Sequence, residues 1–267
     1  MNQLVKAVIY SNSWVAICFA FLTYGTLSYY HLPNVFTYTS INFFSVLSAY
    51  QFHRLYGGKQ KNQAVTEREK WITTHKKANS ILAFCSFSAL LISVSTPIWT
   101  VSTLTIGVAL IIIVIFYVVP LPLLVKSLRA VPYVKSLLIS ISWTSMLVVP
   151  FINENKHLPV LFLIFIFLQT NAQLILFDSR DVNRDERSLK TIPQIIGINK
   201  SKLVVFCLVI IGYILMTIET GFHPFFLAGI TSNLLGLIIK RNQYDSLLAE
   251  FIWDFPFFII GISFYFL

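Results

Sequence analysis

Nine apolar runs follow one another along the chain, separated by polar connections. Each run is roughly 17 to 22 residues long, enough for an α-helix to cross a bilayer. The apolar residues are continuous, and they neither keep to one helical face nor alternate as in a strand. We therefore predict an all-α, polytopic membrane protein of about nine transmembrane helices. The predicted spans are residues 9–30, 35–56, 79–96, 98–119, 134–151, 157–178, 202–220, 224–240 and 248–266.

The organisation predicted from this pattern is a single transmembrane domain, residues 1–267. No tandem repeat, low-complexity tract or Gly/Ser linker interrupts the runs. The first run follows a single basic residue, Lys6, without a small-residue cleavage site. We interpret it as a retained span, not a signal peptide.

Composition supports the membrane assignment. The chain is 56% hydrophobic and only 12% charged, whereas an average soluble domain has about 25% charged residues. Cys18, Cys85 and Cys207 all fall inside apolar runs and have no metal-ligand spacing. They are interpreted as buried structural thiols.

The net charge of +9 is explained by where the basic residues lie. Of the 20 Lys and Arg residues, only Lys156 falls in the short connections; the others occupy the N-terminus and the long connections. The positive-inside rule then predicts a cytoplasmic N-terminus, cytoplasmic long loops and an outside C-terminus. Anionic headgroups of membrane lipids account for the positive charge, so no nucleic-acid partner is expected.

Three carboxylates lie at the end of the run 157–178. Asp178, Asp181 and Asp185 are spaced i, i+3, i+7, which puts them within about 60° of one another on a helix. They repel one another unless a cation lies between them, and Mg2+ holding phosphate oxygens is the natural candidate. The alternative is a solvated helix end whose acids are neutralised by nearby arginines, namely Arg180, Arg184 and Arg187.

Further polar residues are predicted near the same cytoplasmic face. The second span ends in Tyr50-Gln51-Phe52-His53-Arg54, and a basic stretch runs from Leu128 to Lys135. Glu250 and Asp254 are one turn apart inside the last span, where they either line a cavity or form interhelical hydrogen bonds. Asn171 precedes the Asp motif by about two turns. Its side chain either contacts substrate or forms hydrogen bonds between helices.

Residues 171–197 read NAQLILFDSRDVNRDERSLKTIPQIIG. This stretch resembles the second aspartate-rich region of the UbiA superfamily of intramembrane prenyltransferases. The family pattern is an upstream Asn, then D-x-x-D-x-x-x-D, then a basic residue and T-x-P-x-x-x-G. The matching positions here are Asn171, Asp178, Asp181, Asp185, Lys190, Thr191, Pro193 and Gly197.

The resemblance implies a UbiA-like helical bundle that transfers the prenyl group of a prenyl diphosphate to a lipid or aromatic acceptor. In that family Mg2+ bridges the diphosphate to two aspartate-rich motifs, and the tail lies in a membrane-embedded groove. By resemblance, Asp178, Asp181 and Asp185 would be catalytic metal ligands. Lys190 would contact phosphate, as would Lys135, just before the fifth span.

The chain departs from the family at the first aspartate-rich motif, expected near residues 45–60. No Asp or Glu precedes Glu67. One interpretation is that Arg54, His53 and Lys59 neutralise diphosphate directly, with Gln51 lining the cavity; another is that Glu67 and Glu69 move in from the loop. Alternatively, the fold serves a non-catalytic or altered lipid-binding role. A secondary transporter is the remaining alternative, although the inverted repeats expected of one are not visible.

Overall fold

The computed structural model describes residues 3–56, 67–96, 98–120, 127–131, 134–183, 189–239 and 247–266. Within these ranges the regular secondary structure is entirely helical, which confirms the all-α prediction. Each of the nine predicted spans overlaps a helix, and the second one, 35–56, coincides with α3 (Val35–Tyr56).

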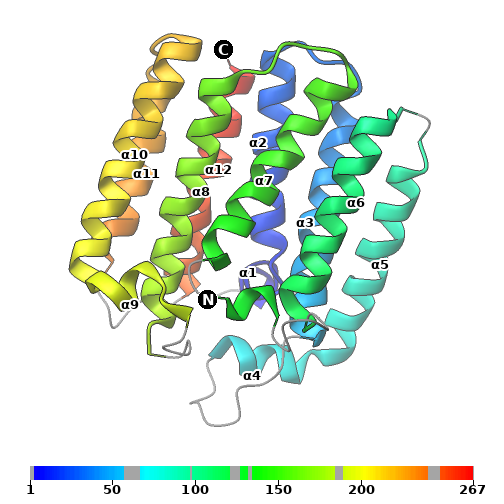
Figure 1. The fold of residues 1–267 in the computed structure, drawn as a ribbon. Helices are drawn as coiled ribbons and strands as arrows, with labels where there is room; N and C mark the ends of the chain where they lie inside the picture. The colour runs from blue at the N-terminus through cyan, green and yellow to red at the C-terminus, as the bar shows by residue number, and fades with distance from the viewer. Residues whose placement is uncertain are drawn as a thin grey trace. The chain divides into compact units, whose positions relative to one another are not determined.

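The helices form two compact units, coloured along the chain in Figure 1. Unit 1 comprises Met1–Pro97 and Lys240–Leu267, and unit 2 comprises Ile98–Ile239. The helices of unit 1 are α1 (Gln3–Tyr10), α2 (Ser13–Tyr29), α3, α4 (Glu67–Thr74), α5 (Lys76–Val94) and α12 (Leu247–Tyr265). Those of unit 2 are α6 (Val101–Val118), η1 (Leu128–Ala130), α7 (Val134–Asn153), α8 (Val160–Asp181), α9 (Ile192–Ile196), α10 (Ile198–Thr220) and α11 (Phe225–Ile238). The single domain stays a prediction.

Six of the described helices are long and apolar enough to cross a membrane, namely α5, α6, α7, α8, α10 and α12. The bent pair α1 and α2 would make a seventh span. With 14 residues, α11 is about 21 Å long and falls short of a bilayer core of about 30 Å. Polar residues such as Asn42 and Gln51 set α3 apart from the six. The chain is therefore an integral membrane protein, while the count of nine spans and its orientation stay predictions.

The first predicted span is broken. Between α1 and α2 the chain bends by 71°, and Asn12 adopts a left-handed conformation with φ of 63°. Asparagine tolerates this conformation better than most residues because its short side chain can bond locally. The break leaves backbone carbonyls at the end of α1 that α2 cannot satisfy.

In unit 1, α2 packs against α12 on one side and α3 on the other, and α3 packs against α5. The α2–α12 contact buries large side chains completely, among them Phe19, Leu22 and Phe257. The two helices approach closely at Gly25 and Gly261, where a Cβ built on Gly25 would lie 1.9 Å from the Gly261 carbonyl oxygen. Only glycine permits such an approach, a common means of helix association in membranes.

In unit 2, α8 lies between α7 and α10, and α6 and α11 pack on the outer sides of α7 and α10. The face of α8 toward its neighbours carries fully buried Phe162, Phe165 and Ile166, and α10 contributes Val209 and Met216. This packing holds the C-terminal end of α8, with its carboxylates, beside the first turn of α7.

Asn153, at the C-terminal end of α7, joins α6 to α7. Its Oδ1 accepts hydrogen bonds from the Thr100 backbone N–H at 3.0 Å and the Thr103 hydroxyl at 2.9 Å, and its Nδ2 donates to the Ile98 carbonyl. We expect Asn153→Leu to lower stability by about 2 kcal/mol, because it leaves buried polar groups without their partner. Thermal unfolding in detergent measures this. Thr105→Val is the control, since that exposed hydroxyl bonds only to its own helix; equal losses in both variants would contradict the prediction.

Candidate functional site

The C-terminal turn of α8 buries its first carboxylate. Asp178 is 4% exposed and Ser179 2% exposed, and the Ser179 hydroxyl donates to the Ile175 carbonyl at 2.8 Å. Carboxylates at this position face the negative end of the helix dipole, which disfavours them. The end of α8 therefore requires cations close by.

Lys135 supplies one of these cations. Its Nζ lies 2.7 Å from Asp178 Oδ1, and the two side chains are only 13% and 5% exposed. Lys135 is in the first turn of α7, where a positive charge is itself disfavoured by the helix dipole. The ion pair thus compensates both helix ends. Lys135 was predicted to contact phosphate, and in the structure it pairs with Asp178, one of the predicted metal ligands.

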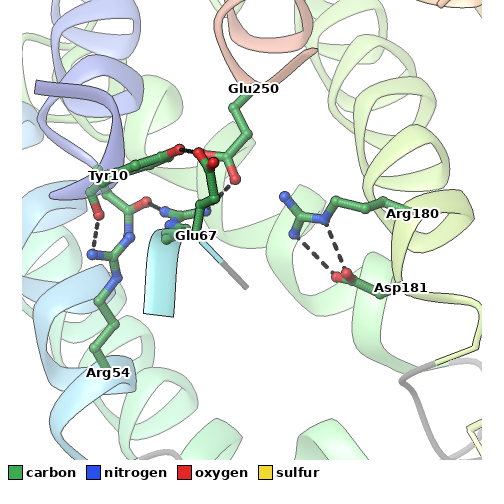
Figure 2. Close-up of polar contacts among 8 residues, drawn as sticks. Tyr10, Arg54, Glu67, Arg180, Asp181 and Glu250 are labelled. Carbon is green, nitrogen blue, oxygen red and sulfur yellow. Dashed lines mark hydrogen bonds and ion pairs between the residues drawn. The ribbon is translucent and has the colours of Figure 1, made fainter. Parts of the chain in front are cut away.

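Asp181 has a different cation. Arg180 Nε and Nη2 donate to Asp181 Oδ1 and Oδ2 at 2.9 Å and 3.1 Å, as Figure 2 shows. The guanidinium carbon also lies 5.2 Å from the Phe177 ring centroid. This pair matches the alternative in which arginines neutralise the acids. Asp185, Arg184 and Arg187 lie outside the described residues.

The segment after the Asp motif forms a short, well-capped helix. The Thr191 N–H donates to Gln194 Oε1 at 3.0 Å, Pro193 occupies the first turn of α9, and Gly197 ends α9 with φ of 82°. Two positions of T-x-P-x-x-x-G thus have a local explanation: Pro193 starts a helix, and Gly197 ends it with a positive φ. Lys190 precedes it as an exposed residue with φ of 47°.

In unit 1, polar side chains of α3 bind the backbone at the break between α1 and α2. Gln51 Nε2 donates to the Ser11 carbonyl at 2.7 Å, and Arg54 Nη1 donates to the Tyr10 carbonyl, as Figure 2 shows for Arg54. Both side chains cap the end of α1. Gln51 was predicted to line a cavity and Arg54 to contact diphosphate; both roles stay predictions, while the structure places the two side chains on the backbone at this break.

The second part of this cluster was not predicted. Arg68 of α4 binds Glu250 Oε1 of α12 at 3.0 Å and also donates to the Asn12 side chain. The Tyr10 hydroxyl donates to Glu67 Oε2 at 3.3 Å (Figure 2). The only signal in the sequence was Glu250 itself, since a carboxylate inside a span requires a partner.

Asn171, Asp254 and His53 were also predicted near the site, and the structure places each of them within a helix. Asn171 Nδ2 donates to the Phe167 carbonyl of its own helix at 2.9 Å. Asp254 is 8% exposed in α12, and His53 is partly buried in the last turn of α3. These placements agree with structural roles without testing the functional ones.

The described residues contain no group of three His, Cys, Asp or Glu side chains suited to a metal ion. Asp178 and Asp181 supply two carboxylates one turn apart on α8. This donor set fits Mg2+, which is commonly held by one or two carboxylates together with waters and substrate phosphates. Of the predicted ligands, these are the two that the structure describes.

No family model, curated protein or solved structure matches this chain.

Proposed function

We propose that the chain is a UbiA-like prenyltransferase that acts on a prenyl diphosphate at a cytoplasm-facing site within the membrane, assisted by Mg2+. The prenyl group would pass to a lipid or aromatic acceptor. The proposal rests on one observation above all: a D-x-x-D pair at the end of a helix long and apolar enough to cross a membrane, with a buried lysine of the preceding helix on its first carboxylate. The sequence resemblance at residues 171–197 supplies the reaction class.

The site residues suit the binding of a diphosphate head. Asp178 and Asp181 would hold Mg2+, which when bound supplies positive charge to the departing diphosphate. Lys135 and Lys190 would donate N–H groups to phosphate oxygens, because an ammonium has three rotatable donors. The apolar helices leave the prenyl tail in a lipid-like environment.

In the proposed reaction the allylic C–O bond breaks and its electron pair leaves with the diphosphate. The acceptor then forms a bond to the same carbon and loses a proton. Cations around the diphosphate stabilise the charge that develops on the leaving oxygen.

A non-catalytic or altered lipid-binding role for the same fold is the second candidate. It is favoured by the contact of Arg54 with the Tyr10 carbonyl, which gives that residue a structural task at the helix break. A binder of this kind would retain affinity for prenyl lipids without turnover.

Ligand-induced stabilisation tests the proposal without knowledge of the acceptor. In nanodiscs, non-hydrolysable prenyl diphosphate analogues with Mg2+ should raise the stability of the folded protein by about 2.7 kcal/mol at a hundredfold excess over Kd. We expect Asp181→Asn to abolish the Mg2+-dependent part, because it removes a charged ligand at nearly constant shape.

The control is Glu154→Gln, an acid beyond the opposite end of α7 from Lys135. It should respond to the analogues like the wild type. If no analogue of any chain length stabilises the wild type, or Asp181→Asn responds fully, the prenyl diphosphate proposal is wrong. Stabilisation without turnover on any acceptor would favour the lipid-binding candidate.

A further inference from the structure

The ion pair between Lys135 and Asp178 already occupies the carboxylate that the proposed function assigns to a metal ion. The two charged atoms are 2.7 Å apart, and they come from different helices that pack against each other. Both side chains are largely buried, so water screens the pair poorly. Asp178 is therefore held by a cation that belongs to the chain itself.

Replacement of the Lys135 ammonium at Asp178 by a divalent cation alone is unfavourable. The cation has to displace the ammonium, which then remains close by in a poorly solvated position and repels it. Asp181 differs in this respect. Its partner Arg180 is its chain neighbour, and its side chain is 21% exposed, so the two carboxylates are not equally accessible to an ion from solution.

An anion that arrives with the metal changes this exchange. Phosphate oxygens offer the Lys135 ammonium new acceptors, and its flexible stem lets it turn from carboxylate to phosphate. The metal takes Asp178 while the anion takes Lys135, and no buried charge is left without a partner. The anion therefore gives the displaced Lys135 ammonium a new partner, and the metal does the same for the Asp178 carboxylate.

We propose that the Lys135–Asp178 pair is a latch that closes Asp178 to a free divalent cation and opens it to a metal–diphosphate complex. The site would bind the complex as a unit. That the anion is a diphosphate rests on the proposed function; the closing of Asp178 to the metal alone rests on the ion pair. By linkage, the metal and the anion must each raise the affinity for the other by the same factor.

The test uses Mn2+ as the metal probe and inorganic pyrophosphate as the anion, with the full chain in neutral-lipid nanodiscs. Binding of Mn2+ is followed by electron paramagnetic resonance, with and without pyrophosphate. In the wild type we expect pyrophosphate to tighten Mn2+ binding about tenfold or more, a typical coupling. Lys135→Met should bind Mn2+ alone about tenfold more tightly and lose most of this coupling.

Lys202→Met is the matched control. Lys202 is another partly buried lysine of unit 2, and its Nζ donates to the Leu237 and Ile239 carbonyls at 2.6 Å and 3.3 Å. Its replacement should leave Mn2+ binding and the coupling unchanged.

Two results would overturn the latch: unchanged Mn2+ affinity in Lys135→Met, or independent binding of Mn2+ and pyrophosphate to the wild type. The second needs no variant, so it decides the matter even if Lys135→Met does not fold. These outcomes are separate from those of the prenyl analogues. Coupled binding of Mn2+ and pyrophosphate without stabilisation by any prenyl analogue would support the latch and refute the prenyltransferase proposal. Stabilisation by prenyl analogues without this coupling would support the prenyltransferase proposal and refute the latch.

Discussion

Gly261→Ala should destabilise the protein by more than about 3 kcal/mol, beyond the usual cost of overfilling a core. A Cβ at this position would lie 2.2 Å from the Phe21 carbonyl oxygen and 2.5 Å from the Leu22 nitrogen. Both are backbone atoms of α2, so no side chain can rotate away and the two helices must separate. Thermal unfolding and size-exclusion profiles in detergent measure the loss, and we expect little monodisperse protein.

The same substitution at Gly107 in α6 is the matched control, because a Cβ there has no heavy atom within 4 Å. Gly107→Ala should be neutral or slightly stabilising, since alanine favours the helical state by about 0.5–1 kcal/mol over glycine. Similar stability for both variants would mean that α2 and α12 do not approach each other as closely as described.

Arg68→Met is expected to cost about 3 kcal/mol, at the lower end of what breaking a buried ion pair costs. The Glu250 side chain is 7% exposed, so its charge loses an ion-pair partner that water cannot replace. Arg68 also binds the Asn12 side chain at the α1–α2 break, so α4 should loosen from α12 and from this break together. Limited proteolysis around α4 and thermal unfolding both report this change.

Lys70→Met tests whether removing any positive charge from α4 lowers the stability, because Lys70 lies in the same helix as Arg68 and is exposed. It should change stability by less than about 0.5 kcal/mol. The double variant Arg68→Met with Glu250→Leu should recover much of the loss, since an apolar pair can replace a buried ion pair. A double variant as unstable as the sum of the two single changes would refute the ion-pair explanation.

The positions of the helices could be predicted because long apolar runs leave no alternative in a bilayer, as the match between residues 134–151 and α7 illustrates. The break before α2 was not predicted. Its signal was present as the polar triplet Ser11-Asn12-Ser13 inside an apolar run, with the residue type that best tolerates a left-handed conformation at its centre.

The candidate site was accessible to sequence reasoning only in part. The spacing of Asp178 and Asp181 on one helix is local, so periodicity reveals it. Their partners are a different matter: Arg180 is adjacent in sequence, whereas Lys135 meets Asp178 only through packing of α7 on α8. The Arg68–Glu250 pair joins residues that are 182 positions apart in the sequence, and no local pattern encodes such a contact.

The return of α12 to α2 also sets an order of events during synthesis. Unit 2 is continuous in sequence, so the ribosome completes all its helices before α12 emerges. The helices α2, α3 and α5 are in the membrane by then, with the face of α2 around Gly25 uncovered and Arg68 still lacking Glu250. The packing of α12 against α2 is therefore the last step in forming unit 1. A chain halted before residue 247 lacks α12, so the face of α2 that α12 covers stays exposed.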